Sequence, residues 1–432
     1  MSTIQDEFKR IEEKKAWGAE FIKIRVASSE YEYTHRDAKK PQNKALNRYR
    51  DVSPYDHTRV KLQGGISDYI NASLVQLPNV NRRYILTQGP LPHTISHFWQ
   101  MVWEQNSKAV IMLNNVIEKG TVKCAQYFPK GEDSGGDDVL NCEESNLHVN
   151  LLKEEDFGYY LVRTLVVEDV KSGEAKEVLQ FHYNRWSDFS VPKSPDAFLR
   201  FLHHIRKSGS LDDNVGPPVI HCSAGIGRSG TLCLVDTCLL MIEKQGSTDG
   251  VNVHQVLLEM RRCRMGLIQT PDQLRFSYLA IMEGAKAVLD GKGLESFHVE
   301  QVETIPENPP PLPPRQIKRP HSPDDEVEGH IKHPKEDDGS GDGETICQEN
   351  SSSTNDSSEQ AELRRRKRQE KNKALADKVA EMKKKQRDSE DWNDKKSMYQ
   401  YLGIGVGLCV GAFLLYRWFI GGGGGMEPSL AQ

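Results

Sequence analysis

The chain has 432 residues, more than one ordinary domain needs, and 28% of them are charged. A net charge of −5 gives no case for direct nucleic-acid binding by the chain as a whole. Its eight cysteines form neither a CxxC pair nor a metal-ligand spacing, and MSTIQDEFKR at the N-terminus lacks the apolar stretch of a signal peptide. We therefore expect free thiols in a reducing compartment, no metal and no cofactor.

Residues 1–293 have the aliphatic and aromatic content of one globular domain. Runs rich in β-branched and aromatic residues predict strands at 109–113, 159–167, 178–183 and 218–221. Helical periodicity and start signals predict helices at 4–16, 94–105, 194–208, 230–244, 252–262 and 271–288. The mixture favours an α+β fold with helices packed around one sheet.

The composition changes after residue 293. Residues 294–360 are proline-rich and then acidic, with too few aliphatic side chains to offset the cost of ordering, so we expect a disordered linker. Residues 361–396 are basic, with twelve Lys or Arg against four Asp or Glu between 361 and 387. Residues 402–420 are apolar except for Arg417.

The stretch VIHCSAGIGRSGT at 219–231 combines a strand end, a glycine-rich turn and a helix start. A cysteine after apolar residues is ordinarily a small buried hydrophobe. Here the turn would direct several backbone N–H groups, with a helix dipole behind them, at one anion. In that field Cys222 would ionise, and the planar fork of Arg228 would match two phosphate oxygens. The stretch predicts phosphoryl transfer through a cysteinyl-phosphate, without a metal.

The spacing Cys-x5-Arg alone leaves sulfur transferases and arsenate reductases open, because they use related loops. The full HCSAGIGRSGT resembles the signature of the classical, phosphotyrosine-specific protein tyrosine phosphatases. The resemblance covers residues 8–287 and implies a phosphatase acting on phosphotyrosine proteins, with a highly twisted mixed β-sheet flanked by helices. Its other matching blocks are NRYRDVSPYDHTRV, DYINAS, YILTQGPLP, FWQMVWE, KCAQYFP and QTPDQLRFSY.

The resemblance also implies catalytic roles. Cys222 would be the nucleophile, and the Ser229 hydroxyl would stabilise its thiolate when the intermediate hydrolyses. Gln269 would position the attacking water, supported by Gln273. His221 would set the acidity of the cysteine, with a plain structural histidine as the alternative. The phosphate would be held by Arg228 and by the loop residues Ser223, Ala224, Gly225, Ile226 and Gly227.

Four further kinds of contact with substrate are implied. Tyr49 would line a pocket deep enough for phosphotyrosine and too deep for phosphoserine, and Asp51 would accept hydrogen bonds from the substrate backbone. Lys123 would reach toward the general-acid loop, with a solvated lysine as the alternative. Arg25 and Arg261 resemble a second basic pocket that favours another phosphotyrosine or acidic residues.

A tyrosyl leaving group needs a proton, and the resemblance assigns this task to Asp188, with Phe189 stacking on the substrate. The segment, WSDFSVP at 186–192, departs from the family pattern: Ser187 replaces a proline and Ser190 a glycine. Proline stiffens a chain and glycine permits positive φ, so both losses should alter loop closure and slow turnover more than they change KM. The alternative is a low-activity or pseudophosphatase that binds and traps phosphotyrosine proteins.

The tail carries three short signals. PPPLPPR, from Pro309 to Arg315, fits a polyproline II ligand of SH3 domains, with a stiff spacer as the alternative. The runs from Arg364 to Arg368 and from Lys383 to Lys385 predict binding to import receptors or anionic lipid, rather than a solvated charged helix. Residues 402–420 would form a transmembrane helix about 28 Å long, which is close to the hydrocarbon thickness of a bilayer.

Basic residues precede this apolar span, so a tail anchor would leave the catalytic domain in the cytosol. The modest, glycine-rich span favours the thinner endoplasmic reticulum membrane, and forms that lack it could enter the nucleus. For family members with this layout, the resemblance implies receptor kinases, Janus kinases and STAT proteins as substrates. Such an enzyme would be a negative regulator of tyrosine kinase signalling.

Overall fold

The computed structural model describes residues 3–65, 67–77, 80–186, 191–192 and 194–297, and near the C-terminus 366–367, 369–370, 372–382, 384 and 387–388. The predicted acid loop at 187–190, the PPPLPPR stretch, most of the predicted linker and the apolar span at 402–420 lie outside these residues. Within the described part of the chain, no helix is long and apolar enough to cross a membrane.

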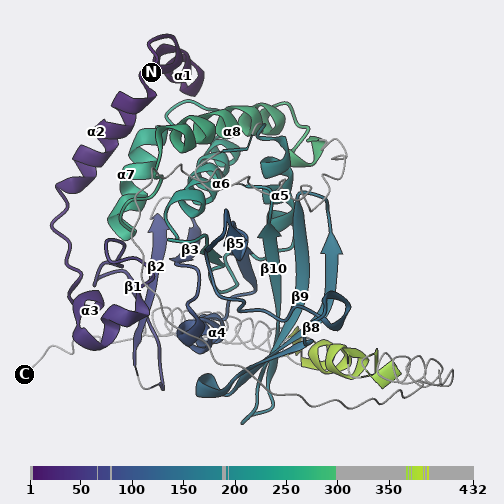
Figure 1. Ribbon diagram of the computed structural model, residues 1–432. Helices are drawn as coiled ribbons and strands as arrows, with labels where there is room; N and C mark the ends of the chain where they lie inside the picture. Colours follow the sequence, from purple (N-terminus) through teal and green to yellow (C-terminus); the bar gives the residue numbers. More distant parts are fainter. Residues whose placement is uncertain are drawn as a thin grey trace, which may run out of the picture. The chain divides into compact units, whose positions relative to one another are not determined.

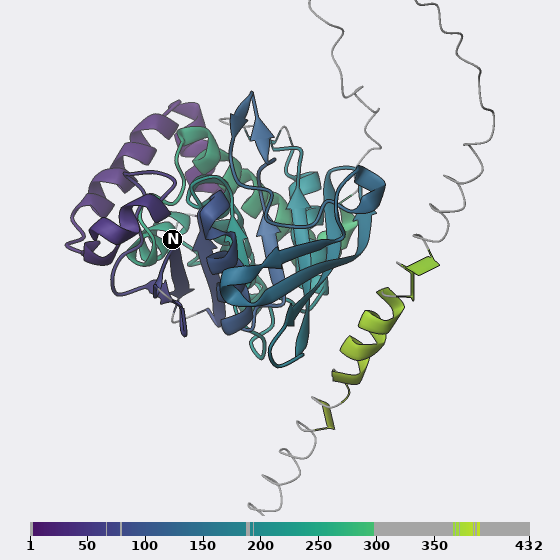
Figure 2. The ribbon, with the colours of Figure 1, turned by 60° about the horizontal axis from the view of Figure 1, so that its bottom comes forward.

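A mixed nine-stranded sheet forms the centre of the fold (Figure 1), in the order β1-β2-β3-β11-β4-β10-β9-β8-β7. Strands β3, β11, β4 and β10 run parallel, and the pairs toward both edges are antiparallel. Figure 2 shows the twist of the sheet toward the long strands β8 and β9. The strands are β1 (Arg59–Lys61), β2 (Tyr69–Leu77), β3 (Arg82–Thr87), β4 (Ala109–Met112), β7 (Val139–Cys142), β8 (Leu147–Asp156), β9 (Tyr160–Asp169), β10 (Ala175–Tyr183) and β11 (Val219–His221), with a separate hairpin of β5 (Ile117–Glu118) and β6 (Thr121–Val122).

Helices cover both faces of the sheet. The α-helices of the catalytic domain are α1 (Ile4–Glu13), α2 (Trp17–Ser29), α3 (Arg36–Lys39), α4 (Ile95–Glu104), α5 (Asp196–Lys207), α6 (Gly227–Gln245), α7 (Val253–Cys263) and α8 (Pro271–Leu289). Short 3-10 turns lie at Pro41–Leu46, Pro92–Thr94, Glu132–Ser134, Glu143–Ser145 and Leu294–Ser296.

Strand β11 is buried on both faces of the sheet. Its successive side chains point to opposite sides, so they enter two different cores. Val219 packs with Ile85 and Val110 in the core beneath α4, whereas Ile220 packs with residues of α5, α6 and α8 in the other core. This placement, between β3 and β4, fixes the end of β11 at the middle of the molecule. The chain leaves that end through Cys222 and enters α6.

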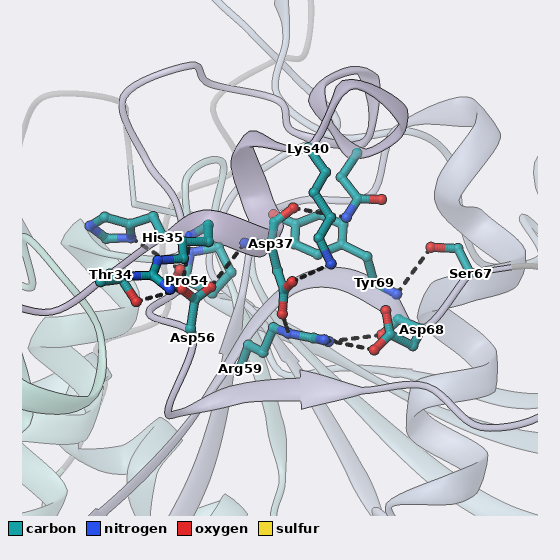
Figure 3. A network of polar contacts seen from close by, with 12 residues as sticks. Thr34, His35, Asp37, Lys40, Pro54, Asp56, Arg59, Ser67, Asp68 and Tyr69 are labelled. Atoms are coloured by element: carbon teal, nitrogen blue, oxygen red, sulfur yellow. Dashed lines mark hydrogen bonds and ion pairs between the residues drawn. The ribbon is translucent and has the colours of Figure 1, made fainter.

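The segment before β1 is anchored to the sheet edge by ion pairs (Figure 3). Arg59 donates from Nε to Asp37 at 2.5 Å and from Nη2 to Asp68 at 2.6 Å, and Lys40 pairs with Asp37 at 2.6 Å. These partners lower the pKa of Asp37, the hydrogen bond from Lys40 being the largest cause. The following loop, which carries Tyr49, is tied to β2 through Asn47, whose Oδ1 accepts hydrogen bonds from Tyr69 and Asn71.

Near the C-terminus, residues 372–382 form a helix whose apolar side packs on the sheet. Leu375 and Val379 are buried against Val166 of β9 and Ala175 of β10. Lys378 pairs with Glu168 at 2.6 Å, and the Ala175 N–H lies 3.4 Å from the sulfur of Met382. The basic segment thus contains a docked amphipathic helix.

The strands and helices expected from the sequence are present, with shifted ends. The helix expected at 4–16 stops at Glu13, because Lys15 adopts a left-handed φ of +49°, and α2 comes next. Helix α6 begins at Gly227 rather than Gly230, so Arg228 and Ser229 belong to its first turn. Leu294, just beyond the expected domain end, is buried in the core.

Candidate active site

The turn between β11 and α6 requires glycine at one position. Gly225 has a φ of +71°, and a Cβ there would lie 2.0 Å from the Thr87 carbonyl oxygen. An L side chain is excluded both by this backbone conformation and by the approach of β3. The turn therefore passes directly over the end of β3, and the N-terminal N–H groups of α6 face the same centre as the turn.

The Cys222 thiol lies at the bottom of this turn and is 4% exposed. Burial alone would raise the pKa of the thiol. The charge of Arg228 and hydrogen bonds from the Ser229 hydroxyl and from the Ser229 and Gly225 amides outweigh burial, so the pKa lies below its ordinary value. Among the described residues, the Ser229 hydroxyl has no other hydrogen-bond partner. This environment stabilises a thiolate.

Arg228 is held by a buried carboxylate from the β5–β6 hairpin. Its Nη1 and Nη2 donate to the two oxygens of Glu118, each at 2.7 Å, and Nη1 also donates to the Leu113 carbonyl at 2.8 Å. A bidentate pair of this kind fixes the plane of the guanidinium. The cation that would meet a phosphate is thus oriented by an element more than 100 residues earlier in the chain.

Arg264 supports the turn from behind and is fully buried. Its Nε donates to the Gly225 carbonyl at 2.9 Å and its Nη2 to the Ala224 carbonyl at 3.1 Å. Two further bonds reach Asn71 and Ser73 of β2. Because both turn carbonyls point outward to Arg264, the adjoining N–H groups are turned inward.

His221 precedes the nucleophile and is fully buried. Its Nδ1 lies 3.0 Å from the Cys222 carbonyl oxygen, and its Nε2 lies 2.7 Å from the Tyr127 hydroxyl. Burial lowers the pKa of His221 to about 4, so the ring is neutral at pH 7. The histidine therefore acts on Cys222 through hydrogen bonds and carries no charge.

Tyr49 contacts the turn directly. Its hydroxyl lies 2.8 Å from Ser223 Oγ, which donates to the Lys123 carbonyl at 3.0 Å. Ser223 thus links the Tyr49 loop to the segment after β6. Lys123 itself is partly buried, and Asp51 is exposed on the turn two residues after Tyr49.

Gln269 and Gln273 approach the turn from the start of α8. Gln273 Oε1 accepts the Gln269 N–H at 2.9 Å, and the Thr270 hydroxyl caps α8 by accepting the Gln273 N–H at 3.1 Å. The preceding Ile268 has a φ of +64°, which is strained for a β-branched residue. Its N–H donates to the Ile226 carbonyl at 3.0 Å, so this strained residue joins the two loops.

A hollow of about 390 Å³ adjoins Gln269 and is lined by both Arg25 and Arg261. Arg261 is 2% exposed, and its guanidinium donates to the Leu267 and Ile268 carbonyls at 2.9 and 3.0 Å. Its other two hydrogen bonds go to Ile24 and Ser28 of α2, so Arg261 joins the Gln269 loop to α2, and Arg25 is the more accessible of the two cations.

The comparisons with known proteins agree with this geometry. A family model described as protein-tyrosine phosphatase matches residues 43–283. Tyrosine-protein phosphatase non-receptor type 2 of Homo sapiens is 44% identical over 426 residues, covering 97% of this chain and 98% of that protein. The rat type 2 protein is 55% identical over 285 residues, 66% of each chain. Tyrosine-protein phosphatase non-receptor type 61F of Drosophila melanogaster is 49% identical over 293 residues, 67% of this chain and 53% of that protein.

The chain belongs to the protein-tyrosine phosphatase family. It is a protein-tyrosine phosphatase of the classical non-receptor kind. Its order of phosphatase domain, linker, basic cluster and apolar tail resembles the T-cell protein tyrosine phosphatase, which is non-receptor type 2. ELRRRKRQEKNKALADKV favours that protein over its sibling, non-receptor type 1, whereas the proline motif favours the sibling. The similarity to type 2 relatives confirms the first expectation.

In this phosphatase the residues predicted around Cys222 come together. The loop from Ser223 to Gly227 surrounds the nucleophile, while Arg228 and Ser229 approach it from α6, Gln269 from the loop before α8, and Tyr49 from the N-terminal loop. Trp186, the first residue of the WSDFSVP segment, is buried at 1% exposure. Asp188, Phe189 and the two departures Ser187 and Ser190 lie outside the described residues.

Sequence reasoning missed residues that support the site from other elements. Glu118 and Arg264 carry no local motif that separates them from surface residues, and Tyr127 lies in the matching block KCAQYFP with no role assigned to it. Arg48 looks in the sequence like a charged neighbour of Tyr49, yet it donates to the Gly89 and Pro90 carbonyls at 2.9 and 2.7 Å. For Arg264, the sequence offered only its position as a sign of a role in the site: it follows an amphipathic helix and precedes the apolar residues before Gln269.

Proposed function

We propose that this protein-tyrosine phosphatase hydrolyses phosphotyrosine through a cysteinyl-phosphate intermediate, with Cys222 as the nucleophile. The thiolate attacks phosphorus, the S–P bond forms and the bond from phosphorus to the tyrosyl oxygen breaks. Asp188 gives its proton to the departing phenolate. Arg228 and the N–H groups of residues 223–228 stabilise the charge on the phosphoryl oxygens.

The second step releases phosphate. Gln269, with Gln273, positions a water that attacks phosphorus, and the water's proton passes to the Asp188 carboxylate. The S–P bond breaks, and Ser229 donates a hydrogen bond to the departing thiolate. Tyr49 and Phe189 flank the phenyl ring, while Asp51 binds the peptide backbone. Lys123 assists the acid loop, and Arg25 with Arg261 forms a second, basic recognition site.

The observation that carries the proposal is the arrangement around Cys222, where a thiol that is 4% exposed lies in the glycine turn beside an Arg228 side chain that Glu118 holds in place. Burial raises the pKa of each other cysteine among the described residues, whereas the pKa of Cys222, which is also buried, is lowered. A thiolate beside Arg228 and inward-facing amides has little purpose in packing. It is the arrangement that phosphoryl transfer to sulfur requires.

The test is acid-quenched mass spectrometry of the full chain during turnover of a phosphotyrosine peptide. We expect one phosphoryl adduct on the peptide that contains Cys222. Cys222→Ser should abolish turnover while keeping peptide binding. Cys142→Ser, which alters another buried cysteine far along the sheet, is the matched control and should keep turnover. An adduct elsewhere, or wild-type turnover in Cys222→Ser, would overturn the mechanism.

The departures at Ser187 and Ser190 favour a second candidate, a low-activity phosphatase that traps its targets. The two functions separate in one comparison. An active enzyme should exceed the kcat of Asp188→Ala by about 10² or more, the usual contribution of a general acid. Equal kcat values would establish the trap. Ser187→Pro should raise kcat with little change in KM if loop closure limits turnover.

We propose receptor kinases, Janus kinases and STAT proteins as the substrates, which would make the enzyme a negative regulator of tyrosine kinase signalling. These substrates, the tail anchor at 402–420 and the endoplasmic reticulum location rest on the resemblance and the tail sequence. The same grounds support the SH3 site from Pro309 to Arg315, the import runs at Arg364–Arg368 and Lys383–Lys385, and the nuclear forms.

Carbonate extraction tests the anchor. The full chain should stay with the membranes, and a chain ending at residue 401 should be released; release of both would exclude the anchor.

A further inference from the structure

A row of three polar side chains crosses β8, β9 and β10. Arg163 is the cross-strand partner of both Glu154 and Gln180, so the three side chains lie on one face of the sheet. Arg163 Nε pairs with Glu154 at 2.5 Å, and its Nη1 donates to Gln180 Oε1 at 2.9 Å. The arginine side chain is 8% exposed, whereas that of Glu154 is 36% exposed. A largely buried cation therefore faces inward along this row.

The row continues from the sheet to the nucleophile. Gln180 Nε2 donates to the Tyr127 hydroxyl at 2.8 Å, and this hydroxyl lies 2.7 Å from His221 Nε2. His221 Nδ1 lies 3.0 Å from the Cys222 carbonyl oxygen. Unbroken hydrogen bonds thus connect Arg163 with the backbone of Cys222, and we call this set the Arg163 relay.

The direction of each bond in the relay is set by its chemistry. A carbonyl only accepts, so His221 Nδ1 carries the hydrogen and, because the ring is neutral at pH 7, Nε2 accepts. Burial raises the pKa of Tyr127 well above its ordinary value, so its hydroxyl keeps the proton and donates it to Nε2. The Tyr127 oxygen then accepts from Gln180. Every donor points from the Arg163 cation toward Cys222.

We propose that Arg163 and Gln180 are positioning residues for Cys222: they fix the direction of the relay and help to hold the cysteine side chain as the thiolate. Hydrogen bonds in series polarise one another in a low dielectric. A cation at the head of the series strengthens the donation by His221, which makes the backbone beside the sulfur more positive. The proposal builds on the nucleophilic role of Cys222, but its test needs no turnover.

Other groups set the background on which the relay acts. These are the other titratable groups near the relay, and a substitution of the uncharged Gln180 leaves all of them in the chain. His182 also faces Arg163, at 3.3 Å, and is neutral because burial lowers its pKa to about 3. Among the described residues, the other charged or titratable groups that face the relay or Cys222 are Arg228 with Glu118, Arg264, Arg48, Cys124 and Glu154.

Two variants at Gln180 test the proposal in the full chain. Gln180→Leu removes both hydrogen bonds that the Gln180 side-chain amide makes in the relay, one with Arg163 and one with Tyr127. Gln180→Glu keeps the shape and the acceptor for Arg163, but a carboxylate cannot donate to Tyr127 and draws the phenol proton away from His221. The measurement is the pH dependence of Cys222 alkylation, monitored by mass spectrometry. Iodoacetamide is the probe because it is neutral and so does not compete for the phosphate site.

We expect the alkylation midpoint to rise by about half a pH unit in Gln180→Leu and by more in Gln180→Glu. If Gln180 had a structural role alone, both variants would lose thermal stability, but their alkylation midpoints would not rise in the order wild type, Gln180→Leu, Gln180→Glu. Asn150→Leu is the control, because this buried β8 amide bonds to the Val166 carbonyl and lies outside the relay. Its midpoint should match the wild type. Unchanged midpoints at Gln180, or an equal rise in the control, would overturn the proposal; if Gln180→Leu does not fold, Gln180→Glu decides.

Discussion

At the scale of single residues, Arg264 shows how a cation can serve catalysis without facing the substrate. Its guanidinium is surrounded by acceptors from the nucleophile turn and from β2, and burial lowers its pKa to about 10, which leaves it charged at neutral pH. Each of these acceptors would otherwise be a buried carbonyl, amide or hydroxyl without a partner. The residue therefore orients the turn and satisfies it at once.

Arg264→Met should consequently disable the turn. We expect a loss of about 3 kcal/mol in the free energy of unfolding, because several buried acceptors lose their donor. kcat should fall about 100-fold as the inward N–H groups lose their orientation. Urea unfolding and turnover of a phosphotyrosine peptide measure the two effects. Arg262→Met, which changes an exposed arginine two residues away, should alter neither by a comparable amount.

The two buried histidines predict how stability depends on pH. Burial lowers the pKa of His221 to about 4 and that of His182 to about 3. Unfolded histidine titrates near pH 6.5, so below this pH the unfolded chain binds more protons and the folded state loses stability. We expect each histidine to remove on the order of 1 kcal/mol per pH unit between pH 6.5 and its folded pKa.

Urea unfolding at pH 7, 6 and 5 measures this slope. His182→Gln should make the slope shallower, whereas His93→Gln, at an exposed position, should leave it unchanged. A stability that stays flat from pH 7 to 5 would show that the buried rings bind protons in the folded state.

At the scale of elements, the N-caps of α7 and α8 are chemically similar but differ in their surroundings. Asn252 accepts the Gln255 N–H at 2.9 Å, and Thr270 accepts the Gln273 N–H at 3.1 Å. Only the second cap lies beside Gln269. The start of α8 therefore couples helix stability to the placement of the proposed water-positioning residue.

Alanine substitutions at the two caps separate stability from catalysis. Thr270→Ala and Asn252→Ala should each lower the free energy of unfolding by about 1 kcal/mol. Only Thr270→Ala should reduce kcat several-fold, because Gln273 loses the contact that fixes it under Gln269. Peptide turnover beside urea unfolding tests this pair. Equal losses of kcat in both variants would show a global effect of stability on activity.

Elements with a clear period or boundary signal could be predicted from the sequence. Pro271 marked the start of α8, and the apolar run before Cys222 marked β11. Helix α2 was not predicted, because its apolar residues lie on all sides of the helix: Ile24 is buried while Ile22 is 58% exposed. Strand β8 escaped as well, because its second half is charged.

At the scale of the whole molecule, the site is assembled from segments far apart in the chain, and this limited what the sequence could reveal. The motif HCSAGIGRSGT predicted the residues that are local to the turn. It could not separate Arg261, Arg262 and Arg264, which look alike in the sequence. The structure divides them into a brace for the Gln269 loop, a surface residue and a brace for the turn. Such division depends on long-range packing, which no local pattern encodes.

The helix at 372–382 is the part of the tail for which the structure makes the sharpest prediction. Its basic composition suggested a solvated helix or a binding signal, yet Leu375 and Val379 are buried on β9 and β10. Leu375→Asp would place a charge in this apolar contact and should release the helix, since burial of one leucine contributes about 2 kcal/mol. Hydrogen exchange should then speed up at least tenfold at 372–382, and exchange in the core strand β11 should stay the same. Ala376→Asp, which adds the same charge on the exposed side of this helix, should keep the slow exchange. If exchange at 372–382 is already fast in the unaltered chain, the docking is too weak to shield the basic segment from import receptors or lipid.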